Sequence, residues 1–392
     1  MTMAIPLSYS FRSIAVRKGS SAMAVGGIAL VVVVFATLLS LAAGFQRVVE
    51  TSGSPRNVIV LRKGADAELQ SQVLRDTARV ISELPIVAEE DGRKLVVFES
   101  VVILARPKRG GGETNVTIRG APPLARDVHA DVRLTQGRWY TPGSNEAVLG
   151  VGLARRLRDI GLGQTLTVGR NTWHVVGLFE AGGSSLESEL WMDGELLQSL
   201  FHRDGVFQSV LFRAAGGARE AAKRLNALTE TDLRLRAMQA LTEKEYYQKQ
   251  AKLMADVITI LGGILTEITS AGAIAGAMNT MYAAVSQRRR EIGCLLSMGF
   301  TPESVWLAFM LESLTLAALG AALGCAVSLA FNGMKTGMTN WATFSETAFE
   351  FRVTPQILAT AALISLAMGF VGGVLPAFRA ARMKVVDALR RA

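Results

Sequence analysis

Cysteine is scarce in this sequence, which has two among its 392 residues. Neither Cys294 nor Cys325 falls within residues 46–254, the longest part of the chain without an extended apolar run. We therefore expect no structural disulfide in that region and no cysteine-based metal site. Cys325 is most simply a small buried residue within an apolar segment.

Residues typical of catalytic centres are also sparse. The three histidines are scattered, and a lone histidine in a strand is more often packed or solvated than a ligand. Ser184 and Ser185 follow two glycines, but the G-x-S-x-G turn of a nucleophilic serine is missing. A solvated face explains the acidic residues Glu187, Glu189 and Asp193 better than a metal site does. We predict no catalytic residue, no bound metal and no enzyme activity in this chain.

The sequence is instead rich in long apolar segments. Charged residues make up 19% of the chain and hydrophobic residues 50%, and the mean hydropathy is +0.31. A helix needs about 20 mostly apolar residues to cross the hydrocarbon core of a bilayer. We predict four transmembrane helices, at residues 22–45, 255–285, 303–333 and 355–378.

Basic residues indicate how these helices are oriented. The net charge is +9, but the decisive basic clusters, among them Arg288–Arg290, flank the apolar segments as the positive-inside rule requires, which argues against a nucleic-acid surface. A cleaved signal peptide over the first apolar segment is a weaker alternative, because that segment is longer than usual for one. We predict a cytoplasmic N-terminal segment at 1–21, a cytoplasmic coupling helix at 286–302, an extracytoplasmic loop at 334–354 and a cytoplasmic tail at 379–392.

Residues 46–254 are numerous enough for one or two folded domains. Alternating apolar and polar residues predict strands, a helix is predicted at 66–84, and Gly169–Asn171 predict a tight turn between two strands. Residues 238–256 have helical composition and predict a stalk, paired with an extension of the first helix over residues 45–51. The predicted fold is an α-helical membrane protein with four transmembrane helices and a mixed α+β extracytoplasmic domain inserted between helices 1 and 2.

Two acidic residues, Glu267 and Glu312, lie within the predicted membrane helices. A carboxylate in the membrane is costly, which makes each a functional candidate. The alternatives are a protonated acid bonded inside the bundle and an acid near a helix end. Glycines four residues apart let helix backbones approach closely, within one chain or between two. These pairs are Gly272 with Gly276, Gly320 with Gly324, and Gly369 with Gly373.

The elbow between the second and third apolar segments reads SQRRREIGCLLSMGFTP. Its composition predicts a short helix ended by Gly299, after which Thr301 caps the next helix with Pro302 at its first position. Positive-inside anchoring explains Arg288–Arg290, but it leaves the ordered apolar residues after them unexplained. A charged helix here is also open to contact by a cytosolic partner.

Two stretches of sequence resemble a known family, the MacB/FtsX/LolC-type ABC transporter permeases. NTMYAAVSQRRREIGCLLSMGFTPESV, followed by an apolar helix with Glu312, is similar to the family signature N-x-M…R-x-x-E-I-G-x-L-x-A-x-G. GGVLPAFRAARMKVVDALR is similar to its C-terminal L-P-A-x-R-A-A-R…A-L-R. The chain departs from the pattern at Leu296 and Ser297, where Arg-Ala is common, and at Val385, where proline is usual.

The resemblance implies a permease subunit that couples ATP hydrolysis by a separate ATPase to motion of the external domain. It implies a permease of the bacterial inner membrane that exports an amphiphilic, peptide or lipid-linked substrate from the periplasm or outer leaflet onward, by mechanical transmission rather than a passage through the bilayer. The chain has no G-x-x-x-x-G-K-[ST] loop, so we expect ATP and Mg to be bound by the partner. The implied contacts with the ATPase are Arg288, Arg289, Arg290, Glu291, Ile292 and Gly293.

Further partners implied by the resemblance are a second permease, identical or related, with two ATPase copies in all. A periplasmic adaptor or substrate protein and membrane lipid complete the set. The alternative function is a non-transporting signal transducer that activates a periplasmic enzyme. We favour export, because residues 46–254 form a larger external domain than is usual for that role.

Overall fold

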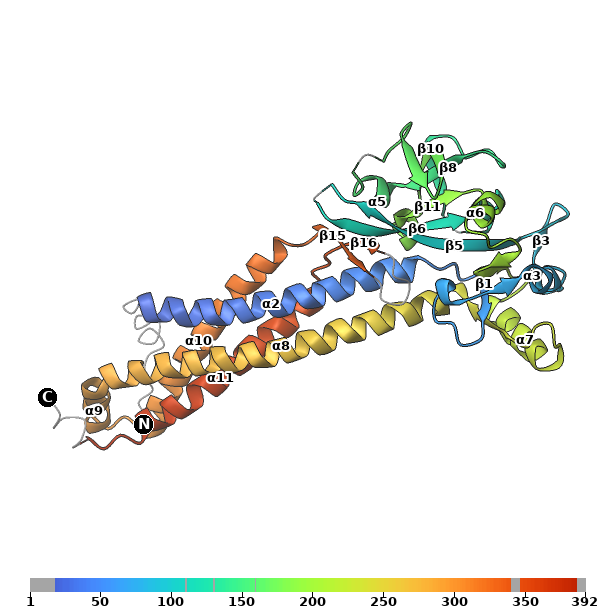
Figure 1. Cartoon of the computed structure of the whole chain (residues 1–392). Helices are drawn as coiled ribbons and strands as arrows, with labels where there is room; N and C mark the ends of the chain where they lie inside the picture. The colour runs from blue at the N-terminus through green and yellow to red at the C-terminus, as the bar shows by residue number, and fades with distance from the viewer. Residues whose placement is uncertain (1–17, 110, 130, 159, 340–345, 386–392) are drawn as a thin grey trace. The chain divides into compact units, whose positions relative to one another are not determined.

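The chain forms two compact units in a computed structural model that describes residues 18–109, 111–129, 131–158, 160–339 and 346–385 (Figure 1). The helical unit contains the residues up to Ala43, Asp256–Met334 and the residues from Phe351 onward. The mixed unit contains Gly44–Ala255 and Lys335–Glu350. The predicted cytoplasmic ends, 1–21 and 379–392, lie partly outside the described residues.

Four helices among the described residues are long and apolar enough to cross a membrane. This confirms that the chain is a membrane protein with four such helices. The observed bounds of all four helices differ from the predicted bounds: three helices are longer than predicted, and the third ends earlier. They are α2 (Lys18–Thr51), α8 (Glu243–Gln287), α10 (Pro302–Leu329) and α11 (Pro355–Ala381).

The starts of α10 and α11 have the same cap. The Thr301 hydroxyl accepts a hydrogen bond from the Ser304 amide at 3.3 Å, and Pro302 is the first residue of α10. The Thr354 hydroxyl does the same for the Ile357 amide of α11, again at 3.3 Å. A capping hydroxyl satisfies an amide that has no partner within its own helix. The prediction for Thr301 and Pro302 is confirmed.

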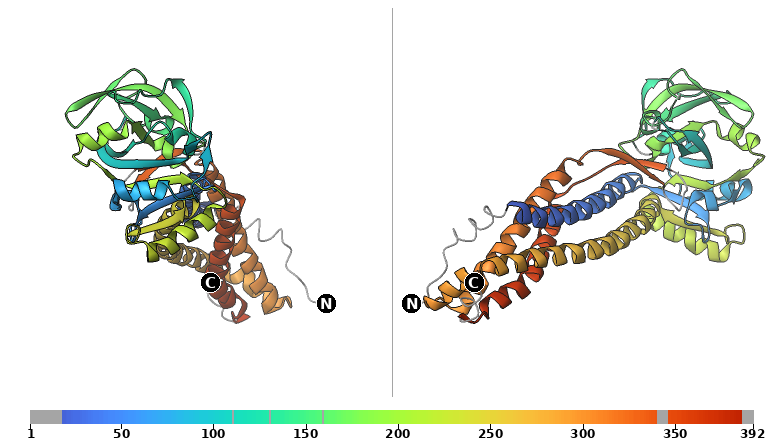
Figure 2. Two further views of the ribbon diagram at one scale, coloured as in Figure 1. Left: turned by 90° about the vertical axis from the view of Figure 1, so that its right-hand side faces the viewer. Right: turned by 60° about the vertical axis from the view of Figure 1, so that its left-hand side comes forward.

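Within the helical unit, α10 packs along α11, as the orange and red helices show from two further sides (Figure 2). The Ser313 hydroxyl donates to the carbonyl of Gly369 at 2.6 Å, and the Ser365 hydroxyl donates to that of Ala317 at 2.7 Å. Small residues and interhelical hydrogen bonds of this kind hold helices together where lipid supplies no hydrophobic drive.

A ten-stranded sheet forms the framework of the mixed unit. Its long strand β5 pairs first with β13, through Val96–Glu99, and then with β6, through Ser100–Pro107, so that it is shared by two halves of the sheet. In sheet order the strands are β14 (Met238–Thr242), β1 (Asn57–Arg62), β13 (Ser209–Arg213), β5 (Val96–Pro107), β6 (Glu113–Gly120), β11 (Glu189–Met192), β8 (Glu146–Gly150), β10 (Asn171–Glu180) and β7 (Arg133–Gly137), with β9 (Thr165–Val168) on β10.

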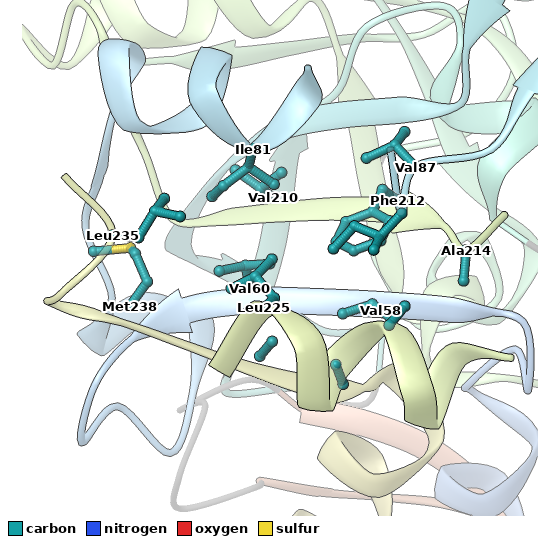
Figure 3. Packing of buried hydrophobic residues seen from close by; sticks show 14 of the residues in the cluster. Val58, Val60, Ile81, Val87, Val210, Phe212, Ala214, Leu225, Leu235 and Met238 are labelled. Atoms are coloured by element: carbon teal, nitrogen blue, oxygen red, sulfur yellow. The ribbon is translucent and has the colours of Figure 1, made fainter. Parts of the chain in front are cut away.

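Each half of the sheet has its own core. In the first, Val58 and Val60 of β1 and Phe212 of β13 share a face with α3 (Arg75–Ser82) and α7 (Ala218–Thr231), which contribute Ile81 and Leu225 (Figure 3). In the second, Trp173 and other residues of β6, β8, β10 and β11 pack against α5 (Val151–Ala154) and α6 (Gly194–Leu200). The mixed α/β character predicted for this part of the chain is confirmed.

The helix predicted at 66–84 is wrong over its first half. The chain forms a 3-10 turn, η1 (Glu68–Gln70), and a strand, β2 (Val73–Leu74), before α3 begins. The strand β2 pairs with β12 (Val206–Phe207), and this distant partner overrides the local helical pattern. Likewise Met238–Thr242 pair with β1 as β14, so the helix predicted from residue 238 begins at Glu243.

Two short hairpins complete the mixed unit. The tight turn predicted at Gly169–Asn171 is confirmed, because β9 and β10 pair directly across it. Where a loop was predicted at 334–354, β15 (Lys335–Thr339) and β16 (Glu346–Glu350) pair with each other. The remaining short elements are β3 (Glu89–Glu90), β4 (Arg93–Lys94), α4 (Ala125–Val128) and η2 (Ser185–Ser188).

Candidate functional site

The elbow between α8 and α10 is a separate short helix, α9 (Arg289–Ser297). Arg288 precedes it with φ of −104° and ψ of 15°, which separates α9 from α8. After its end, Gly299 has φ of +94°, a left-handed conformation that glycine adopts without steric cost. The prediction that Gly299 ends a short helix here is confirmed.

The helix α9 has a buried face and an exposed face. Ile292 is 1% exposed and packs with Val305 and Phe309 of α10 in an apolar cluster, and Gly293 is also buried. The opposite face is exposed at positions with helical spacing. Its residues, called here the outer face of α9, are Arg290, Glu291, Cys294, Ser297 and Met298.

The six residues predicted to contact an ATPase therefore divide into three groups. Arg290 and Glu291 are on the outer face, and Arg289 is half-buried. Ile292 and Gly293 face the interior of the helical unit. Arg288 also points inward, where it meets the predicted intramembrane acid Glu312. The docking role of these residues stays a prediction.

Arg288 and Glu312 form an ion pair within the helical unit. The Arg288 Nη1 lies 2.9 Å from the Glu312 Oε2, and the side chains are 11% and 6% exposed. The Arg288 guanidinium also lies 6.0 Å from the centre of the Phe309 ring and 3.7 Å from the Glu291 carboxylate. Arg288 therefore connects a buried acid of α10 with an exposed acid of α9.

The other predicted acid, Glu267, lies in different surroundings. It is exposed on α8, next to Ile264 and Ile268, which are 52% and 66% exposed. The apolar part of α8 is only 17% buried, against 39–50% for the three other membrane-crossing candidates. One face of α8 is therefore left uncovered by the described part of the chain, and Glu267 is part of that face.

The predicted glycine pairs behave in two ways. A Cβ on Gly324 would lie 2.6 Å from Val32 of α2, and one on Gly369 would lie 2.4 Å from Ala317 of α10, so both glycines sit where helices cross. Gly320 and Gly373 are equally close to α2 and α10. Apart from the backbone of α8 itself, no atom of the described residues lies within 4 Å of a Cβ built on Gly272 or Gly276. The α10 and α11 pairs serve packing within the chain, whereas the α8 pair lies open.

A buried ionic network in the mixed unit was not predicted from the sequence. Arg119 of β6 is 2% exposed and contacts Glu189 at 2.7 Å, Glu99 at 2.8 Å and Glu68 at 2.9 Å. Glu99 also binds the His129 Nε2 at 2.8 Å. The available signal was a charged residue within each of the apolar strand sequences VVFESVVIL and TNVTIRG. Here the network means Glu68, Glu99, Arg119, His129, Glu189 and Glu243.

Glu243, the first residue of α8, is part of this network. Its Oε1 lies 3.7 Å from the His129 Nδ1, and its Oε2 accepts hydrogen bonds at 3.0 Å from the Ser54 amide and from the Asn57 side chain. Glu243 is 2% exposed. The start of α8 is thus fixed to the interior of the mixed unit by charged contacts.

Burial and charge act in opposite directions on the two central groups of the network. Burial alone would raise the pKa of Glu99, but the charges of His129 and Arg119 outweigh it and lower that pKa to about 2. Burial would lower the pKa of His129, but the charges of Glu99 and Glu243 raise it to about 10. Both groups are therefore charged at neutral pH.

A cavity of about 50 Å³ adjoins the network, lined by Glu68, Arg119, Glu189, Tyr246 and Tyr247 among others. This volume has room for a few water molecules. It is far below the 300 Å³ or more of typical ligand pockets. The cavity is therefore no site for an amphiphilic substrate within a single chain.

The β15–β16 hairpin is bound to the rest of the mixed unit through Glu346. Its carboxylate lies 2.8 Å from the Lys108 Nζ and 3.5 Å from the Arg156 guanidinium, and it accepts a hydrogen bond from the Thr114 hydroxyl. Burial acts to raise the pKa of Glu346, but these partners prevail and lower it. Phe349 meets Phe45 edge to face, with ring centres 5.7 Å apart.

Comparison with known proteins gives two family matches along the chain. Residues 21–228 match the MacB-like periplasmic core domain, and residues 263–385 match the FtsX-like permease C-terminal domain. The first match alone covers more than half of the chain. Together they include the mixed sheet except β14, the later part of α8, and α9, α10 and α11.

Similar proteins carry related names. The uncharacterized ABC transporter permease YknZ of Bacillus subtilis is 24% identical over 71% of this chain and 70% of its own length. The macrolide export ATP-binding/permease protein MacB 1 of Yersinia pestis is 28% identical over 60% of this chain, but over only 36% of its own length. The periplasmic region of MacB from Actinobacillus actinomycetemcomitans gives a TM-score of 0.37 at 14% identity, over 51% of this chain and 94% of that one.

Proposed function

The chain belongs to the MacB/FtsX-type ABC transporter permeases, and we propose that it couples ATP hydrolysis by a separate ATPase to movement of the mixed unit. ATP and Mg are bound by the ATPase, and this chain has no catalytic residue of its own. The movement drives export of an amphiphilic, peptide or lipid-linked substrate. The observation that carries the proposal is α9, a short charged helix with an open outer face between two membrane-crossing candidates.

The outer face of α9 is the proposed contact with the ATPase. Arg290 and Glu291 offer one charge of each sign, and Met298 is 63% exposed beside them. Methionine and arginine are both enriched in protein interfaces relative to the rest of the surface. Arg289 is half-buried and borders this face.

The proposed orientation follows the basic residues. Arg288–Arg290 follow α8, and Arg379 and Arg382 lie at the end of α11, so both regions are assigned to the cytoplasm of a bacterial inner membrane. The mixed unit, most of whose residues lie between α2 and α8 in the sequence, is then inserted between membrane helices 1 and 2 and faces the periplasm.

Two connections support transmission of motion. The helix α8 runs without interruption from Glu243 to Gln287, so a single helix begins at the network contact of Glu243 and ends at the residue before Arg288. The β15–β16 hairpin, which lies between α10 and α11 in the sequence, is held within the mixed unit through Glu346. A displacement of α9 is therefore transmitted to the periplasmic side by helices rather than by a passage through the bilayer.

A second permease chain is proposed to cover the open face of α8. A carboxylate exposed to lipid is costly, and Glu267 lies on this face beside apolar residues more than half exposed. Gly272 and Gly276 leave room there for close approach of another helix. The face is thus suited to a partner helix, from an identical or a related chain.

Affinity purification of the full chain from its native membrane, followed by native mass spectrometry, tests the proposal. We expect two permease chains with two ATPase chains, and ATP hydrolysis that responds to the periplasmic cargo. Co-purification of an adaptor or cargo protein supports export, and co-purification of a cell-wall hydrolase supports the signalling alternative instead. Recovery of the permease without any ATPase in mild detergent contradicts both.

A further inference from the structure

We propose that the ion pair between Arg288 and Glu312 positions α9 so that its outer face meets the ATPase. The inference rests on the proposed docking at α9 and assigns a role to two residues that do not themselves touch the partner. Both were singled out separately in the sequence, one as a docking residue and the other as an intramembrane acid. Their pairing changes the role of each.

The pair is enclosed by apolar side chains. Glu312 follows Val305 and Phe309 along one side of α10, and Leu316 comes one turn later. These residues belong to a cluster with Ile292 of α9, which is 1% exposed. The ion pair of 2.9 Å is therefore a directional contact among apolar contacts that have no preferred direction.

Because of where Arg288 lies in the sequence, its contact with Glu312 can set the orientation of α9. Arg288 lies between the last residue of α8 and the first residue of α9, where the backbone changes direction. Its carbonyl accepts the Ile292 amide at 2.9 Å, which makes Arg288 part of the first turn of α9. Fixing its guanidinium on Glu312 therefore fixes where α9 starts and how it is rotated.

Arg288 also reaches the outer face. Its Nε lies 3.7 Å from the carboxylate of Glu291, whose side chain is 60% exposed. Arg288 thus holds one acid inside and one acid at the proposed interface. Loss of Glu312 removes the buried carboxylate partner of the guanidinium and thereby changes the surroundings of Glu291 without altering any residue of the outer face.

A buried ion pair and an apolar pair can be equally stable, but only the ion pair specifies a direction. Removing one partner leaves an uncompensated buried charge, whereas replacing both by apolar residues of similar size is often neutral for stability. The double variant Arg288→Met with Glu312→Met therefore separates positioning from stability. If the ion pair only stabilises the fold, the double variant retains both the stability and the coupling to the ATPase. If the ion pair positions α9, the double variant retains the stability but loses the coupling.

The experiment uses the full chain with its ATPase in lipid nanodiscs. We compare the wild type, Glu312→Gln, the double methionine variant, and the control Arg382→Met, which removes an exposed arginine stacked on Phe378. The readouts are thermal stability, the amount of bound ATPase, and ATP hydrolysis stimulated by the permease. Cys294, exposed on the outer face, is labelled with a maleimide in a Cys325→Ala background to report its shielding by the ATPase.

We expect the double variant to be as stable as the wild type, with ATPase stimulation lowered roughly three- to thirtyfold, the range for residues that carry coupling between sites. We expect Cys294 to be labelled faster in its complex, and Arg382→Met to behave as the wild type. A double variant with full stimulation and normal shielding of Cys294 overturns the inference while leaving the proposed function intact. A wild-type chain that binds no ATPase overturns the proposed function and the inference together.

Discussion

Arg119 and Glu189 are joined by two parallel hydrogen bonds of 2.7 and 2.8 Å between the neighbouring strands β6 and β11. The same guanidinium also holds Glu68 of η1 and Glu99 of β5. Because β5 is shared by both halves of the sheet, this single side chain sits where the two cores of the mixed unit meet.

Replacement of Arg119 by methionine is expected to destabilise the mixed unit by about 3–5 kcal/mol, because three buried carboxylates lose their cation. Hydrogen exchange of the β6 amides in the full chain measures the change in opening free energy. The control is Arg224→Met, which with its partner Glu220 lies on the exposed side of α7, and which is expected to change stability by less than about 0.5 kcal/mol. Similar small effects for both variants would contradict the structural role of the network.

The stability of the mixed unit is expected to fall in alkali because of His129. The folded pKa of about 10 exceeds the ordinary value of 6.5, so this contribution is complete below pH 6.5 and is lost as the pH rises towards 10. The variant His129→Gln should flatten the decline of the unfolding free energy between these two pH values. His174→Gln, at an exposed position on β10, is the matched control and should leave the alkaline decline unchanged.

Glu99 is expected to make the stability of the mixed unit fall in acid, whereas His129 makes it fall in alkali. Its folded pKa of about 2 is below the ordinary 4.5, so its contribution is present above pH 4.5 and is lost as the pH falls towards 2. Glu99→Gln should therefore remove part of the acid-induced loss of stability, measured by denaturant unfolding of the full chain between pH 2 and 6. An acid limb that is the same in the variant and the wild type would refute this assignment.

Reversal of the charge of Glu291 is expected to uncouple ATP hydrolysis from function, because Glu291 is exposed at 60% on the outer face of α9. Glu291→Arg should insert and fold normally while permease-stimulated ATP hydrolysis falls roughly three- to thirtyfold. Glu220→Arg reverses an acid of similar exposure on α7 and serves as the control. Unchanged stimulation in Glu291→Arg would rule out docking through this face.

The glycines of α10 and α8 are expected to respond differently to the same substitution. Gly324→Leu forces a side chain against Val32, so the helical unit should lose about 1–3 kcal/mol of stability. A Cβ at Gly276 has no described residue outside its own helix within 4 Å, so Gly276→Leu should leave that stability unchanged while weakening association between permease chains. Thermal unfolding and native mass spectrometry measure the two effects. Equal loss of stability in both variants would exclude a separate role for the α8 face.

Features fixed by neighbouring residues were predictable from the sequence. The four apolar helices follow from composition, and the boundary between α9 and α10 follows from Gly299, Thr301 and Pro302, which act on the backbone beside them. Features that depend on distant partners were missed. The strand β14 forms because β1 lies beside it, although its sequence and that of the following residues favour a helix.

The candidate site shows the same division between local and distant effects. Arg288 and Glu312 each stood out as a charge in or beside an apolar segment, but nothing in the sequence pairs two residues 24 positions apart across a helix and a turn. The network around Arg119 draws on residues from Glu68 to Glu243, so it exists only once the sheet has formed. An alternating pattern of apolar and polar residues indicates that a strand residue is buried, but it does not indicate which charged residue contacts it.

The β15–β16 hairpin determines which fragments of the chain can retain the native contacts of the mixed unit. The mixed unit contains Lys335–Glu350 as well as Gly44–Ala255, so four chain connections, rather than two, join it to the helical unit. A soluble fragment cut as one continuous piece from residues 44–255 would lack Glu346, and Lys108 and Arg156 would lose a shared buried partner. A fragment that retains its native contacts must carry the hairpin as well, joined through a linker that replaces residues 256–334.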